Sequence, residues 1–181
     1  AGSHHTCALL DSGGVKCWGN NESGQLGDNT RIERGEPAYV NNLLSGVTAI
    51  SVGEYHSCAL MDTGGVKCWG SNSIGELGNG LPDSSYITPE DVINLSDAAV
   101  SISSWDRHTC VVMEDYNVKC WGSNWFGQLG DGTTSHQFKP KDVLGLSDQA
   151  LSVTTGKNHT CVHLASGGIQ CWGDNREGQL G

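Results

Sequence analysis

The sequence has few charged residues, few prolines and no long hydrophobic run, and each of these shortages excludes a class of protein. Only 17% of its 181 residues are charged and 4 are proline, against 26 glycines. No segment shows helical apolar spacing over three turns, and none approaches the roughly 20 apolar residues that a membrane span needs. Many glycines without a helical pattern indicate short strands joined by tight turns. We therefore expect an all-β protein without membrane insertion.

Basic residues and catalytic motifs are also scarce. The chain has 10 Lys and Arg against 20 Asp and Glu, a formal charge of −10. Because an acidic surface repels phosphate backbones, the composition argues against a nucleic-acid partner. The sequence contains no serine-centred elbow, no H-E-x-x-H zinc motif, no phosphate-binding loop and no isolated acidic pair. We expect a protein without enzymatic activity and without a cofactor.

What the chain does contain is a fourfold repeat. A His-x-Cys segment, a Cys-Trp-Gly segment and a Gly-x-Leu-Gly turn follow one another four times. A period near 50 residues is typical of units that stack on copies of themselves to bury their faces. We treat residues 1–181 as one partial domain and place the repeats at residues 1–46, 47–98, 99–149 and 150–181.

Each copy holds two cysteines, separated by nine residues that include a turn. The midpoint of each pair lies in the turn, so the two cysteines face each other across a hairpin, about 4.5–5.5 Å apart at Cβ. Free buried thiols and a His/Cys/Cys metal site that lacks a fourth ligand are less favoured alternatives. Four bridges indicate an oxidising compartment, extracellular or at the cell surface. The predicted disulfides are Cys7–Cys17, Cys58–Cys68, Cys110–Cys120 and Cys161–Cys171.

The second repeat indicates how one unit is built. Residues 47–52, 56–61 and 66–69 have the pattern of short strands, and residues 88–92 fit a fourth, outer strand. Both faces of the middle hairpin carry apolar side chains, so its sheet must be covered on both sides. A small antiparallel sheet packed between equivalent sheets is a propeller blade. We predict a β-propeller of four-stranded antiparallel blades.

The repeated motif also resembles a known family. The run Gly-x-x-His-Thr-Cys-Ala-Leu, then Val-x-Cys-Trp-Gly-x-Asn-x-x-Gly-Gln-Leu-Gly, with Gly-Asp-Gly-Thr-Thr at 130–134, resembles the regulator-of-chromosome-condensation repeat in its cysteine-paired, secreted form. The resemblance covers the whole chain and implies a seven-bladed ring. The chain holds about three and a half repeats, so we expect it to be a segment of a longer protein. No functional residue of the family's nuclear exchange factor, or of the secreted β-lactamase inhibitor of similar fold, can be transferred to this chain.

Residues that recur in every copy are expected to build the scaffold. The tryptophans should pack between blades, since buried aromatic side chains dominate core energetics. The histidines should be hydrogen-bonded by backbone groups, because buried polar groups need partners. These two sets are Trp18, Trp69, Trp121 and Trp172, and His5, His56, His108 and His159.

Binding residues are expected where the copies differ. Trp105 replaces a glycine of the repeat and is followed closely by Arg107, and Trp125 and Phe126 occupy a variable pair of positions. Tyr86 ends the loop that varies most. Exposed tryptophan and arginine are typical anchors of interfaces, although Trp125 fits packing between blades equally well. We predict a scaffold that binds a protein partner or assembles with itself. A glycan-binding propeller is the alternative, and an enzyme inhibitor or exchange-factor-like regulator comes third.

Three asparagines begin an Asn-x-Ser/Thr triplet, the acceptor for N-linked glycans in secreted eukaryotic proteins. They are Asn21, Asn94 and Asn158, and Asn94 is the strongest candidate because Asn21 also fits a structural position in the turn.

Overall fold

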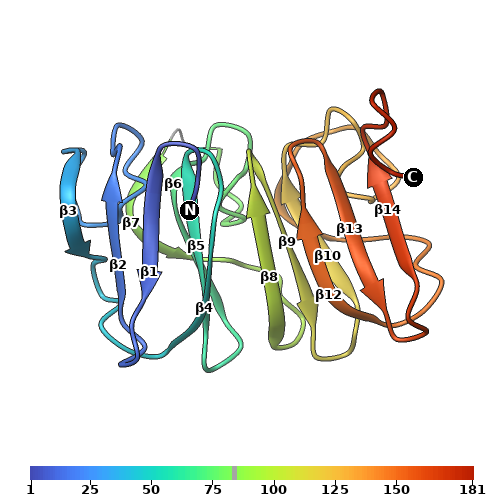
Figure 1. Ribbon diagram of the computed structural model, residues 1–181, viewed down its shortest axis with the longest axis horizontal. Helices are drawn as coiled ribbons and strands as arrows, with labels where there is room; N and C mark the ends of the chain where they lie inside the picture. The colour runs from blue at the N-terminus through green and yellow to red at the C-terminus, as the bar shows by residue number, and fades with distance from the viewer. Residues whose placement is uncertain (83–84) are drawn as a thin grey trace.

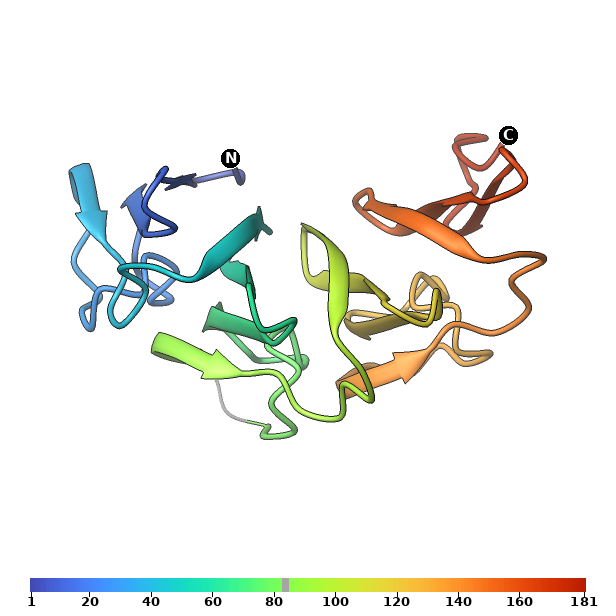
Figure 2. The same ribbon diagram turned by 90° about the horizontal axis from the view of Figure 1, so that it is seen from below.

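The structure is a computed structural model that describes residues 1–82 and 85–181, so Asp83 and Ser84 lie outside the described residues. Its regular elements are strands, arranged in four antiparallel sheets. The sheets follow one another along an arc, each forming one blade (Figures 1 and 2). The predicted fold class, a partial β-propeller, is confirmed. Among the described residues there is no helix of the length and hydrophobicity that crossing a membrane requires.

Within each blade, the strands pair in sequence order from the inner strand to the outer strand. Blades 2 and 3 show the full set of four strands, and the described strands of blades 1 and 4 form three-stranded sheets. Blade 1 consists of β1 (His5–Leu9), β2 (Val15–Gly19) and β3 (Arg34–Tyr39). Blade 2 consists of β4 (Val47–Val52), β5 (His56–Met61), β6 (Val66–Ser71) and β7 (Ser85–Asp91). Blade 3 consists of β8 (Ala99–Trp105), β9 (His108–Met113), β10 (Val118–Gly122) and β11 (Gln137–Asp142). Blade 4 consists of β12 (Ala150–Thr155), β13 (His159–Leu164) and β14 (Ile169–Gly173).

The outer strand differs from the sequence-based expectation. In blade 2 it begins at Ser85 rather than at residue 88. Its pairing with β6 is interrupted between the partners of Cys68 and Gly70, and Pro89 lies in this irregular stretch. Pro37 and Pro140 occupy the same place in β3 and β11. Because proline has no N–H to donate to the ladder, a bulge on an outer strand accommodates it at little cost.

All four predicted cysteine pairs form disulfides in the structure. The two cysteines of each pair are direct partners in the hairpin register, as Cys7 and Cys17 are in blade 1. Their Cα atoms lie 4.1 Å apart, close to the roughly 4.5 Å of a non-hydrogen-bonded pair. All eight cysteines are paired, so the alternative metal site has no thiolate available to it.

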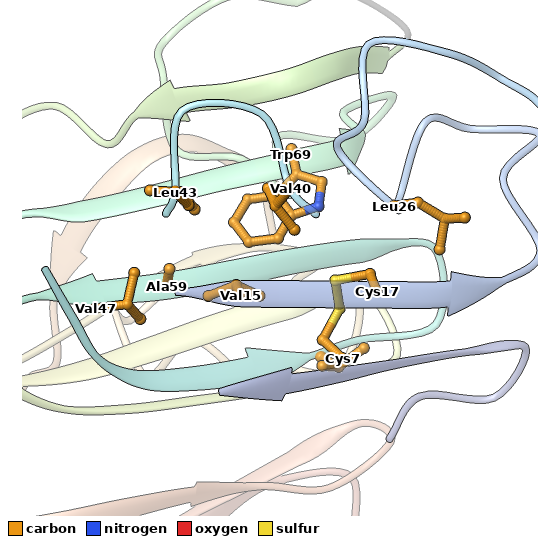
Figure 3. Packing of buried hydrophobic residues seen from close by; sticks show 10 residues of the cluster. Cys7, Val15, Cys17, Leu26, Val40, Leu43, Val47, Ala59 and Trp69 are labelled. Atoms are coloured by element: carbon orange, nitrogen blue, oxygen red, sulfur yellow. A yellow bond between two sulfur atoms is a disulfide. The ribbon is translucent and has the colours of Figure 1, made fainter. Parts of the chain in front are cut away.

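The hydrophobic core lies between blades rather than within them. In the first interface, Val15 and Leu26 of blade 1 pack with Val47 and Trp69 of blade 2 (Figure 3). The second and third interfaces repeat this arrangement with the equivalent residues of the following blades. In blades 2 and 3, one face of the hairpin therefore packs on the next blade, and the opposite face packs on the preceding blade.

Trp69, Trp121 and Trp172 pack between blades in the structure, and each is fixed by the turn of the preceding blade. Trp18, in blade 1, is half-buried and belongs to none of the three core clusters. The indole N–H of Trp69 donates to the carbonyl of Gln25 at 2.9 Å, and Trp121 and Trp172 make the equivalent bond. The last glycine of the Gly-x-Leu-Gly turn lies against this ring. A Cβ at Gly27 would be 2.7 Å from Trp69 Nε1, and the φ of Gly27 is +66°. Both facts require glycine.

The histidines have different partners from those expected. In His5, His56 and His108 the Nε2 atom bonds a hydroxyl of the next blade instead of a backbone group: His5 bonds Ser57 at 2.8 Å, and His56 bonds Thr109 at 2.9 Å. The Ser57 hydroxyl in turn donates to the carbonyl of Gln25 at 2.9 Å. The histidine side chain points into the interface because it shares a strand face with the disulfide. Sequence reasoning within one repeat could not identify a partner in the next repeat.

Candidate binding surface

The variable segments of the chain gather on one face of the molecule. In blades 2–4 the inner strands β4, β8 and β12 end there, and in blade 1 the turn at residues 2–4 leads into β1 from the same side. The strands that carry the second cysteine, β2, β6, β10 and β14, also end there, so these turns and the long loops that follow lie together along the upper edge of Figure 1. We call this the upper face. It consists of the inner turns 2–4, 53–55, 106–107 and 156–158 and the long loops 20–33, 72–82, 123–136 and 174–181.

Trp105 changes the inner turn of blade 3. In blade 2 the equivalent residue is Gly53, where a Cβ would lie 2.3 Å from Cε1 of the His56 ring. Blade 3 avoids this clash by extending the strand pairing to Trp105 and His108. The turn keeps two residues, as in blade 2, where the Gly53 N–H donates to the carbonyl of His56, but Asp106 adopts a φ of +47°. Trp105 is therefore the last residue of β8 rather than part of a loop, and 41% of its surface is exposed.

The inner turns of all four blades line one pocket of about 210 Å³. Blade 1 contributes Ser3, blade 2 Glu54, blade 3 both Trp105 and Asp106, and blade 4 Lys157. The turns of blades 2 and 3 are joined directly, because the Glu54 N–H donates to the carbonyl of Asp106 at 2.8 Å. We call this cavity the inner-turn pocket.

The pocket contains a pair of interacting carboxyl groups. Asp106 is half-buried and lines the pocket together with Glu54. Burial, and then the hydrogen bond and negative charge of Glu54, raise the pKa of Asp106 from 3.8 to about 6. Lys157 and Arg107 oppose this shift. Because two adjacent carboxylates repel each other, the pair retains a proton in mildly acidic solution.

Arg107 lies next to the pocket in a row of aromatic side chains. Its guanidinium lies 5.6 Å from the centroid of the Tyr55 ring. The other neighbour of Tyr55 is His4, whose ring stacks on it at a centroid distance of 5.9 Å. The Glu54 carboxylate raises the pKa of the Tyr55 phenol. Arg107 is thus held by a cation–π contact with a residue of blade 2.

Trp125 and Phe126 lie further out, on the long loop of blade 3. Trp125 is 67% exposed, and its ring meets the ring of His136 edge-on at 4.9 Å. Phe126 is half-buried beneath the guanidinium of Arg176, which lies 4.6 Å away on blade 4. Phe126 therefore contacts the neighbouring blade, whereas Trp125 presents most of its surface to solvent.

Tyr86 does not belong with the other candidates. It lies in β7 opposite Gly70, half-buried, and packs against the core cluster between blades 2 and 3. The interpretation of Tyr86 as a loop residue that contacts a partner is wrong, because the outer strand begins before it.

The three sequons have different environments. Asn21 is fully buried: its side-chain oxygen accepts from Leu26 N at 2.9 Å, and its amide donates to the carbonyls of Thr30 and Ile32 at 3.1 Å. A glycan cannot be attached there without destroying the turn, so this candidate is withdrawn. Asn158 is half-buried on the upper face. Asn94 is exposed in the connection after β7, on the opposite face, where a glycan would leave the upper face free.

Of the five residues that line the pocket, sequence reasoning singled out only Trp105 and missed Ser3, Glu54, Asp106 and Lys157. It found no isolated acidic pair, because Glu54 and Asp106 lie one repeat apart and meet only when blades stack. One signal was available. The position after Gly2, Gly53, Trp105 and Gly156 reads Ser3, Glu54, Asp106 and Lys157, so the charge there changes sign from one copy to the next.

The fold and this surface define a β-propeller in which each repeat contains one disulfide and the inner turns line a pocket. A sequence profile described as the regulator of chromosome condensation (RCC1) repeat matches residues 1–25, 47–76 and 151–179. A second profile of the same description matches residues 118–163. The chain belongs to the RCC1 repeat family.

Relatives of known name cover nearly the whole chain. The human probable E3 ubiquitin-protein ligase HERC4 is 37% identical over 185 residues, which is 99% of this chain and 17% of HERC4. Yeast RCC1 (Prp20), solved bound to Kap60, superimposes with a TM-score of 0.83 at 21% identity, covering 96% of this chain and 42% of that one. The ectodomain of the receptor kinase CR4 from Physcomitrella patens gives a TM-score of 0.59 at 26% identity, covering 95% and 39%. The chain thus spans about a sixth of HERC4 and less than half of either solved chain.

Proposed function

We propose that this chain is a protein-binding or assembly scaffold and that its upper face is the contact surface. The observation that carries the proposal is Trp105, which replaces a scaffold glycine and forms the wall of a pocket lined by the inner turns of all four blades. Partly exposed tryptophan beside arginine is typical of the residues that dominate interface energies. A solved relative of the same fold, yeast RCC1, is bound to the protein Kap60. The proposal includes no catalytic step.

We propose further that the protein works in an oxidising compartment, outside the cell or at its surface. Eight cysteines in four disulfides support this, because such bridges rarely persist in reducing compartments. The similarity to the CR4 ectodomain supports it as well. HERC4 is named as a ubiquitin ligase and adds no support.

Alkylation of the protein isolated from its source tests the compartment. Peptide mass mapping should show the eight cysteines of this chain unmodified after N-ethylmaleimide without a reductant, and all eight modified after reduction. Eight adducts without reduction would refute the proposed compartment.

Site-specific photo-crosslinking tests the contact surface. A photoreactive phenylalanine analogue is introduced at Trp105 or at Trp125, with Tyr39 as the matched control because it is 52% exposed on the outer strand of blade 1. We expect one protein adduct, either a partner or a second copy, from positions 105 and 125 and none from position 39. Equal labelling at all three positions would contradict a binding surface on the upper face.

Glycan binding is the second proposal, and the exposure of Trp125 favours it. The Trp125 ring is 67% exposed and meets the His136 ring edge-on, so its face is available to stack on a sugar. A lectin would be retained on a polysaccharide resin, eluted by free sugar, and no longer retained after Trp125→Ala. Leu144→Ala removes an equally exposed apolar side chain and serves as the control.

A further inference from the structure

We propose that the inner-turn pocket receives a lysine or arginine side chain of the protein partner. In this arrangement the Glu54 and Asp106 carboxylates hold the cation against the Trp105 ring. The inference rests on the proposed protein-binding function and specifies the chemistry of the contact.

The size and construction of the pocket suit a single side chain. Its volume of about 210 Å³ is below the roughly 300–1,000 Å³ of small-molecule sites. The two carboxyl groups come from adjacent blades, and the hydrogen bond from the Glu54 N–H to the Asp106 carbonyl holds the backbones of these two residues together. The site is thus preorganised, and binding does not have to order it.

The charge of the pocket favours a cation. Glu54 and Asp106 both line the pocket, and two neighbouring carboxylates repel each other. Above the pKa of Asp106, about 6, both groups are ionised, and an entering ammonium or guanidinium group relieves this repulsion. The exposed Trp105 ring adds a cation–π contact. The formal charge of −10 on the chain would also speed the approach of a basic partner.

The cations already near the pocket do not occupy this position. Arg107 is held over the Tyr55 ring. Lys157 is exposed, and the described residues include no ion pair within 4.0 Å that involves it. The charged or titratable groups that act on Asp106 are Glu54 from blade 2, its neighbour Arg107, and Lys157 from blade 4. Lys157 is therefore a competitor for the incoming cation, and its removal should strengthen binding.

A short peptide tests the inference on the full 181-residue chain. The probe is acetyl-Gly-Gly-Lys-Gly-Gly-amide, and its twin carries Nε-acetyl-lysine. Binding is followed by NMR through the indole N–H signal of Trp105, which Trp105→Phe assigns. We expect the lysine peptide to shift this signal at pH 7.5 and the acetylated twin to leave it unchanged. Binding should weaken several-fold at pH 5, where Asp106 is protonated.

Three charge variants sharpen the test. Asp106→Asn keeps the turn, since asparagine tolerates the φ of +47°, and should weaken binding at least tenfold. Lys157→Gln should strengthen it. Glu36→Gln removes a carboxylate that is exposed on β3 and should have no effect.

Several outcomes would overturn the inference. They are equal binding of the acetylated twin, unchanged binding by Asp106→Asn, and equal weakening by Glu36→Gln, which would indicate only a general charge effect. Displacement of the peptide by a free sugar would assign the pocket to a glycan instead. If Asp106→Asn still forms the protein adduct at position 105, the scaffold function stands and the lysine pocket fails. If the protein without any charge substitution gives no adduct from positions 105 and 125, the proposed scaffold function itself fails.

Discussion

At the scale of single residues, His5, His56 and His108 are neutral cross-links between blades. The Nε2 atom of His56 shares a hydrogen bond with the Thr109 hydroxyl of the next blade, and its Nδ1 atom has no hydrogen-bond partner. Burial lowers the pKa of His56 and of His108 to about 3, and that of His5 to about 4. A protonated ring would place a positive charge inside an apolar interface, so acid should weaken the contact between blades.

This arrangement predicts how stability depends on pH. The folded pKa values lie below the 6.5 of an unperturbed histidine, so their contribution is complete above pH 6.5. It is lost as the pH falls from 6.5 towards 3. For each fully buried ring, the free energy of unfolding should have fallen by on the order of 3 kcal/mol when the pH reaches 4. Urea unfolding between pH 4 and 8 should show this loss, and His56→Gln, which keeps a donor but does not titrate, should reduce it.

Asp106 contributes with the opposite sign. Its pKa is raised from 3.8 to about 6, so its contribution is present below pH 3.8 and is lost as the pH rises through 6. Asp106→Asn should therefore make the acid-induced loss steeper between pH 6 and 4. A stability that does not change with pH from 8 to 4 would contradict the role of the histidines.

At the scale of elements, the inner turn shows what a glycine of the repeat is for. Gly53 does not adopt a positive φ; it is required because the His56 ring occupies the space where a Cβ would be. In blade 3 the glycine is replaced by Trp105, and the following residue, Asp106, adopts a φ of +47°. One substitution thus changed the turn and supplied the aromatic wall of the pocket.

Two glycine substitutions test this explanation. Gly53→Ala should destabilise the protein by about 1–3 kcal/mol, the usual cost of overpacking, because its Cβ would meet His56 Cε1 at 2.3 Å. Gly35→Ala is the control, since nothing lies within 4 Å of a Cβ there and its φ is not positive. The measurement is the urea midpoint under oxidising conditions. Equal midpoints for the two variants would show that contact with the histidine ring does not select glycine.

At the scale of the whole molecule, the position of a blade in the stack determines how well it is covered. Blades 2 and 3 are covered on both faces, and their disulfides, Cys58–Cys68 and Cys110–Cys120, are fully buried. The disulfide of blade 4, Cys161–Cys171, is only half-buried in the 181-residue chain. In repeat proteins each unit is stabilised mainly by its neighbours, so units with one neighbour open more easily.

This difference predicts the order in which the disulfides are reduced. Under limiting dithiothreitol, Cys161–Cys171 should open first, and Cys58–Cys68 and Cys110–Cys120 should open last, because reduction requires access to the sulfur atoms. Loss of each bridge should cost about 2–3 kcal/mol for a closed loop of this length. Differential alkylation with peptide mass spectrometry measures the order. Early reduction of Cys58–Cys68 would mean that the blades do not protect one another in solution.

The sequence by itself determined the blade, its disulfides and the tryptophan column. These features depend on short-range geometry: side chains alternate along a strand, and a turn midway between Cys7 and Cys17 places them opposite each other. Tertiary structure alone decided the histidine partners, the burial of Tyr86 and Asn21, and the meeting of Glu54 with Asp106. Those contacts depend on how far one blade rotates against the next. The packing of large side chains between blades sets that rotation, and no pattern within a single repeat encodes it.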